Sequence, residues 1–219
     1  GRDAGEYYRA TGASLTLAPP PLARRSWDVS VYAEYQNDVA RNTHVALPRV
    51  WQDSVFRTNI RAAEAMQYGS LVRLRPWWGT DPRRAQAGLE IVAQGETGEF
   101  NLARGTATLR TAIPLGSAFR VGAEAGVGTS VGDITPQRMF YLGGPHTLRG
   151  YDASTVAGTS MARGRLEIAR TYSFGSLALF GDWGWAGDRE NIVSANQRIA
   201  AGAGASLLDG LLRVDLARA

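Results

Sequence analysis

Cysteine is absent from all 219 residues of the sequence. This absence excludes a disulfide framework, a thiolate metal site and a cysteine nucleophile. The sequence also lacks any apolar run approaching the roughly 20 residues that a membrane-spanning helix needs. Helical spans are therefore excluded, whereas membrane β-barrels stay possible, because their strands alternate in polarity and give only a weak hydropathy signal.

A charge block of one sign is lacking as well. The 24 basic and 20 acidic residues give a formal net charge of +4, and the basic side chains are spread along the chain, so no nucleic-acid-binding patch is predicted. The histidines, His44 and His146, lie in expected loops without further residues at metal-ligand spacing, so we expect no metal and no cofactor. The chain begins at Gly1 without an initiator methionine or signal segment, which we interpret as a processed, trimmed or partial chain.

Alternation of polar and apolar residues with a period of two is what the sequence has in abundance, and this pattern predicts β-strands. In 27–36, for example, Trp27, Val29, Val31, Ala33 and Tyr35 share one face, and polar residues occupy the other. Ten such segments, each about the length of a tilted membrane strand, are 7–17, 27–36, 69–78, 85–95, 102–112, 118–130, 160–170, 176–186, 197–207 and 210–218.

The polar faces of these segments carry many charged side chains, which could not line a dry sandwich core because each unpaired charge would cost several kcal/mol. Short links alternate with longer ones, as the turns and external loops of outer-membrane barrels do. We therefore predict an all-β fold, a transmembrane antiparallel up-and-down β-barrel wall. A soluble sandwich with its charged faces outward is the alternative.

Aromatic residues near the segment ends suit the two membrane interfaces, where such side chains form girdles. We assign Trp27, Tyr35, Trp78, Trp183 and Trp185 to these positions. No catalytic residue is predicted: Ser130 fits the pattern G-x-S-x-G of a hydrolase, but a glycine-rich loop follows it where that mechanism needs a strand-to-helix elbow. The chain is not expected to be an enzyme.

The most specific stretch is Met139-Phe-Tyr-Leu-Gly-Gly-Pro-His-Thr-Leu-Arg-Gly-Tyr-Asp152, an arginine between glycine-rich turns in a long loop. It is followed by the strand segment 165–170 and by Leu177-Ala-Leu-Phe-Gly-Asp-Trp-Gly-Trp185, which looks like an F-x-D-x-G strand. Together they resemble the sixth-loop signature of the Omp85 superfamily, outer-membrane barrels that insert or export other proteins.

The resemblance implies that the R-G-Y tip of the loop, Arg149, Gly150 and Tyr151, folds back into the barrel lumen. There Arg149 would meet Glu167 and Asp182, two acids that the alternation places on polar faces. A planar guanidinium suits two carboxylates at once, which an ammonium does not. Gly143 and Gly144 would turn the loop inward, and Gly150 would allow close approach to the wall.

The resemblance also implies that residues 1–219 form one incomplete domain, about strands six to fifteen of a sixteen-stranded barrel, without its first and last strands or POTRA domains. The expected function is assembly or translocation of client proteins in the bacterial outer membrane, with the lipid bilayer, outer-membrane or secreted clients and periplasmic accessory subunits as partners. The alternatives are a passive outer-membrane pore or structural barrel, and the membrane anchor of a fused patatin-like lipase.

Overall fold

One curved antiparallel sheet dominates the computed structural model, which describes residues 7–20, 26–40, 59–81, 83–191, 197–208 and 211–219. Neighbouring strands along its edge-to-edge path follow the chain order, and β4 pairs with β5 beside the path. The ten strands of the path are β1 (Tyr8–Leu17), β2 (Trp27–Asp38), β3 (Ala65–Leu74), β5 (Gln86–Gly98), β6 (Leu102–Leu115), β7 (Phe119–Gly132), β10 (Ser160–Tyr172), β11 (Gly175–Gly187), β12 (Arg198–Leu207) and β13 (Leu212–Arg218). The prediction of an antiparallel all-β fold is confirmed.

The two faces of the sheet differ in chemistry, as the alternation predicts. On one face large apolar side chains are exposed, for example Val31 at 52%, Val127 at 56% and Leu179 at 64%. On the other face Arg110 pairs with Glu124 at 2.6 Å, and Glu124 pairs with Arg163 at 2.8 Å. An apolar outer face and a polar inner face are the arrangement by which a strand crosses lipid while lining a wet lumen.

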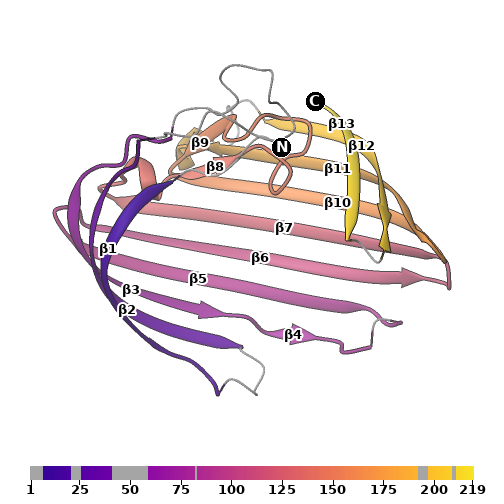
Figure 1. Cartoon of the computed structure of the whole chain (residues 1–219), viewed down its shortest axis with the longest axis horizontal. Helices are drawn as coiled ribbons and strands as arrows, with labels where there is room; N and C mark the ends of the chain where they lie inside the picture. Colours follow the sequence, from indigo (N-terminus) through magenta and orange to yellow (C-terminus); the bar gives the residue numbers. More distant parts are fainter. Residues whose placement is uncertain (1–6, 21–25, 41–58, 82, 192–196, 209–210) are drawn as a thin grey trace.

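The sheet curls but does not close. Strands β1 and β13 lie at opposite ends of the strand order, and among the described residues no ladder joins them. Figure 1 shows the sheet bending round, with β1 and β2 on one side and β12 and β13 on the other. This confirms the expected open wall, because a closed ten-stranded barrel needs pairing between the first and last strands. None of the helical segments in the described residues is long and apolar enough to span a membrane.

Three details differ from the sequence-based expectation. Strand β3 begins at Ala65 instead of residue 69, and Arg75-Pro76 separates it from the two-residue β4 (Trp77–Trp78), because proline lacks the N–H that a ladder needs. The long connection after β7 contains an extra hairpin, β8 (Phe140–Leu142) with β9 (Val156–Gly158). Six strands also run one to three residues beyond their predicted ends, whereas β1, β12 and β13 begin one or two residues later than predicted.

The aromatic residues assigned to the membrane interfaces are not all equivalent. Trp78 and Tyr35 are exposed, at 55% and 40%, and Trp27 and Trp183 are half-buried. The assignment of Trp185 to a lipid interface is wrong, because only 1% of this residue is exposed. Gly187 lies close beside its ring, near the end of β11 where β8 and β9 pack. Alternation in the sequence predicts the position of Trp185 in its strand but not which residues cover its side chain.

Candidate functional site

The loop of residues 133–159 connects β7 to β10 and crosses the polar face of the sheet. It contains a short 3-10 turn, η2 (Pro136–Arg138), and the β8–β9 hairpin. Its side chains bind β1, β2 and β5 at one point and β10 and β11 at another. Figure 1 shows the hairpin between the two ends of the sheet. One loop can reach both regions because the sheet curves around it.

A tight turn at residues 143–148 presents the tip of this loop. Gly143 has a φ of +131°, and a Cβ atom there would lie 2.1 Å from the carbonyl oxygen of Asp152. The hydroxyl of Thr147 donates to the carbonyl of Gly143 at 2.8 Å, and the amide of Leu148 donates to the carbonyl of Gly144 at 3.0 Å. Glycine is required at position 143 by both the backbone conformation and the lack of space.

Arg149 follows this turn and is 6% exposed. Its Nε and Nη2 donate to the two carboxylate oxygens of Asp182 at 2.8 and 2.6 Å, and its backbone N–H donates to Oδ2 of the same residue at 3.0 Å. Its Nη1 donates to Glu167 at 3.1 Å. The guanidinium therefore binds Asp182 in a bidentate manner and forms a single hydrogen bond with Glu167. This geometry is available to arginine but not to lysine.

Further contacts surround the same guanidinium. Its central carbon lies 3.4 Å from the centre of the Phe180 ring, within the range of a cation–π contact. Arg213 donates to Glu167 at 2.6 Å and to Asp215 at 3.0 Å, so Glu167 is shared between two arginines. Asp182, in contrast, has a fully buried side chain whose closest charged partner is Arg149. Asp182 is thus the acid that depends most on Arg149.

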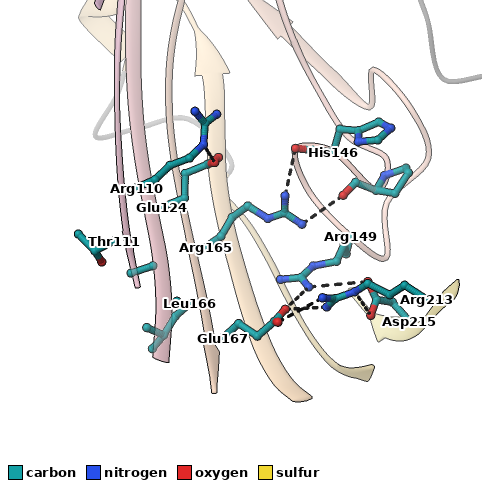
Figure 2. A pocket seen from close by; sticks show the side chains of 13 residues that line it. Arg110, Thr111, Glu124, His146, Arg149, Arg165, Leu166, Glu167, Arg213 and Asp215 are labelled. Carbon is teal, nitrogen blue, oxygen red and sulfur yellow. Dashed lines mark hydrogen bonds and ion pairs between the residues drawn. The ribbon is translucent and has the colours of Figure 1, made fainter. Parts of the chain in front are cut away.

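The turn before Arg149 is held by arginines on β10. Arg165 donates to the carbonyl oxygens of His146 and Pro145 at 3.2 and 3.1 Å, and Arg163 donates to that of His146 at 3.3 Å. Figure 2 shows Arg165 reaching from the strand to the loop backbone, with Arg149, Glu167 and Arg213 grouped nearby. A recess of about 600 Å³ lies between the loop and strands β6, β7, β10 and β13.

Gly150 and Tyr151 complete the tip. Gly150 has a φ of +87°, and a Cβ atom there would lie 3.3 Å from the Cβ of Ala217 near the end of β13. The hydroxyl of Tyr151 donates to the carbonyl of Ile199 on β12 at 3.0 Å. The tip therefore contacts β10 to β13: Arg149 meets Glu167 and Asp182, whereas Gly150 lies against β13 and Tyr151 against β12.

A second group of contacts on the loop was not predicted from the sequence. Arg138 is 7% exposed and hydrogen bonds to Glu96, Glu34 and Tyr8 on three strands at the other end of the sheet. The partners lie between 42 and 130 positions away along the chain, and no local pattern connects them. The only sequence signal was the polar face of segment 27–36, to which Glu34 belongs, since Glu96 lies just beyond the predicted segment 85–95.

Both loop arginines are stabilised in their charged form. Burial by itself lowers the pKa of Arg149, but its hydrogen bonds to Asp182 and Glu167 outweigh burial and raise that pKa. Burial also lowers the pKa of Arg138, but its hydrogen bonds to Glu96 outweigh burial and raise that pKa above the ordinary value. Each guanidinium therefore remains a fixed positive charge held by acids of the wall.

Ser130, in the G-x-S-x-G pattern, lies buried inside β7 and donates to the carbonyl of Thr159 at 2.6 Å. Within the described ranges no group of three or more histidine, cysteine or acidic residues could hold a metal ion. The candidate site is thus the loop together with the strand residues that hold it, and the interactions at this site are ion pairs and hydrogen bonds.

An apolar outer face, a charged inner face and a loop pinned to the inner face by an arginine define a wall of a transmembrane outer-membrane β-barrel. The model of one protein family, "Haemolysin secretion/activation protein ShlB/FhaC/HecB", matches residues 54–207. The chain belongs to this family, within the Omp85 superfamily.

The fold is also similar to that of a solved structure, BamA from Haemophilus ducreyi lacking POTRA domains 1–3. The TM-score is 0.64 at 14% sequence identity, and the match covers 96% of this chain and 50% of that one. The chain thus spans half the length of that structure, and the likeness shows the fold. No curated protein matches the sequence at a significant level.

Proposed function

We propose that this chain is part of the wall of a bacterial outer-membrane barrel that exports a client protein through its lumen. Family membership supports export over assembly, because the family's description names secretion and activation of a haemolysin. The exposed apolar face fits a lipid bilayer, and the charged face opposite it fits a hydrated passage. The family and fold are those of transport and assembly barrels, not of enzymes.

The observation that carries the proposal is the loop 133–159 held on the inner face by Arg149, Asp182 and Glu167. A passive pore would keep its lumen clear of this loop. Here the loop spans the inner face and contacts both ends of the sheet. In this proposal the loop occupies the transport path in the resting state, and the Arg149 contacts fix its position.

The experiment deletes the gene in its host and compares culture-supernatant and outer-membrane proteins by mass spectrometry. Wild-type and Arg149→Ala copies are then returned at matched outer-membrane levels. We expect deletion to remove at least one protein from the supernatant, the wild-type copy to restore it, and the variant copy to fail. An unchanged supernatant would refute export. A general fall in outer-membrane β-barrel proteins would instead indicate the assembly function.

A further inference from the structure

The second cluster on the loop uses all three nitrogen atoms of one buried guanidinium. Nε of Arg138 donates to Glu96 at 3.0 Å, Nη1 donates to the Tyr8 hydroxyl at 2.8 Å, and Nη2 donates to Glu34 at 3.0 Å as well as to Glu96. These partners lie on β5, β1 and β2. A side chain satisfied from three strands is held in a built site, not by a chance surface contact.

Glu96, the main acceptor, is itself surrounded. Its side chain is 1% exposed, and besides Arg138 it accepts hydrogen bonds from the Tyr32 hydroxyl and from Gln94 Nε2. A buried carboxylate without a cation is strongly unfavourable. Arg138 is the cation that hydrogen bonds to Glu96 in the described part of the chain, so the acid and the loop arginine depend on each other.

The neighbouring residue strengthens this attachment. Gln137 donates to Gln36 at 2.9 Å, and its amide group exchanges hydrogen bonds with both backbone groups of Ala63, at 2.9 and 3.0 Å. Gln137 and Arg138 occupy the 3-10 turn that Pro136 begins. Two consecutive side chains thus connect one turn of the loop to β2 and β5 and to the segment before β3.

The positions of the two arginines determine the shape of the attachment. Arg149 binds β10 and β11, whereas Arg138 binds β1, β2 and β5. Strands β6 and β7 separate these two groups in the sheet. The loop between the arginines therefore crosses the inner face and is fastened on both sides of it.

We propose that Arg138 is a second positioning residue of the loop. In this proposal residues 133–159 form a strap, a segment attached to the sheet at two independent points, and not a loop attached only at its tip. The first attachment point, or fastening, is Arg138 and the second is Arg149. Loss of either fastening loosens only its own half of the strap, and loss of both releases the loop from the inner face. The consequence for client export rests on the function proposed above, whereas the two fastenings themselves do not.

The test is hydrogen exchange measured by mass spectrometry on the full-length protein in lipid nanodiscs. The amides of Arg138 and Met139 report the first fastening, because they are hydrogen bonded to Thr135 and Pro136 in the same half of the loop. The amides of Leu148 and Arg149 report the second, because they are hydrogen bonded to Gly144 in that half and to Asp182 on β11. Arg138→Ala, Arg149→Ala, the double variant and Arg73→Ala are compared. Arg73 is the matched control, since its ion pairs with Asp28 and Glu90 stay within the wall.

We expect Arg138→Ala to speed exchange in residues 133–142 by on the order of tenfold or more, with a change below about threefold in 143–151. Arg149→Ala should give the reverse pattern, the double variant should speed both halves, and Arg73→Ala should change neither. The proposal is overturned if Arg138→Ala leaves residues 133–142 protected. It is equally overturned if Arg149→Ala alone loosens both halves as much as the double variant does.

A conservative variant keeps the test decisive if Arg138→Ala does not fold. Residues 1–219 contain no lysine, so Arg138→Lys introduces the only side-chain amine of this region, and its reaction with an acylating reagent can be followed by mass spectrometry of the peptide that contains it. An amine held between Glu96 and Glu34 should react at least about tenfold more slowly than one in an unfolded control. The ion pairs with the two acids keep the amine protonated, and burial shields it from the reagent. Rapid acylation in the folded protein would contradict the second fastening.

The outcome is separable from that of the export experiment. If exchange shows two fastenings but Arg138→Ala exports the client normally, the strap exists and its first half is not part of the transport step. If exchange shows no effect of Arg138→Ala, the strap proposal fails whether or not export takes place.

Discussion

The two attachments of the loop differ in how they are built. Arg149 concentrates on a single buried acid, with three donors directed at Asp182 and one at Glu167. Arg138 distributes its donors over three residues on three strands. A concentrated attachment is vulnerable to the loss of one residue, whereas a distributed one should lose strength gradually. The comparison predicts that single substitutions have larger effects at the Arg149 end.

The largest effect is expected from Arg149→Ala. Among the described residues it leaves the buried Asp182 carboxylate with Arg165, at 3.5 Å, as its remaining ion-pair partner. Breaking a buried pair by removing one partner costs about 3–5 kcal/mol, so the tip should detach and become sensitive to added protease. Strand content by circular dichroism should not change. A loop that resists protease in this variant would show that Arg149 is not what holds the tip.

The two acids should differ in a predictable order. Asp182→Asn removes the charge that faces Arg149, and we expect a loss of about 2–3 kcal/mol, as for hydrogen bonds between buried charged groups. Glu167→Gln should cost about 1 kcal/mol or less, because Glu167 is partly exposed and contributes one bond to Arg149. Thermal unfolding in nanodiscs measures both. Equal effects, or the reverse order, would contradict a tip centred on Asp182.

Gly143→Ala tests the turn that presents the tip. The positive φ and the 2.1 Å distance from a Cβ atom to the Asp152 carbonyl predict strain of about 1–3 kcal/mol. The control is Gly95→Ala, because a Cβ atom there meets nothing within 4 Å. Protease sensitivity of the loop should rise in the first variant and stay constant in the second. If both behave like wild type, the turn tolerates a side chain and the glycine is not required.

The contrast between the two attachments also explains what could be predicted from the sequence. All ten predicted strand segments correspond to strands, because a period of two with one wet and one apolar face is a strong local signal. Arg149 and its acids come from one stretch of chain, in which motif and strands lie close together. Their positions could therefore be derived from the motif and the alternation together.

Arg138 could not be found in this way. Its partners come from β1, β2 and β5, and only the curvature of the sheet brings them near the start of the loop. Strand alternation places Glu34 on the inner face but gives no distance across it, and Glu96 lies just beyond the predicted segment 85–95. For the same reason the burial of Trp185 was missed, since periodicity states which side a residue faces and not what lies against it.

A small effect, comparable with that of Glu167→Gln, is expected from Tyr32→Phe, which tests how far the Arg138 attachment is distributed. The substitution removes the hydrogen bond that the hydroxyl donates to Glu96 and the one that it accepts from Gln94 at 2.6 Å, while Arg138 and Gln94 continue to bind the Glu96 carboxylate. We expect a loss of about 1 kcal/mol, near the middle of the range for one hydrogen bond, because the Gln94 amide keeps its bond to Glu96. That corresponds to a roughly fivefold faster exchange of the Arg138 and Met139 amides. The control is Tyr68→Phe, because Tyr68 is 53% exposed on the apolar face. A Tyr32→Phe effect equal to that of Arg138→Ala would mean that the attachment depends on one hydroxyl, and the difference between the two ends of the loop would disappear.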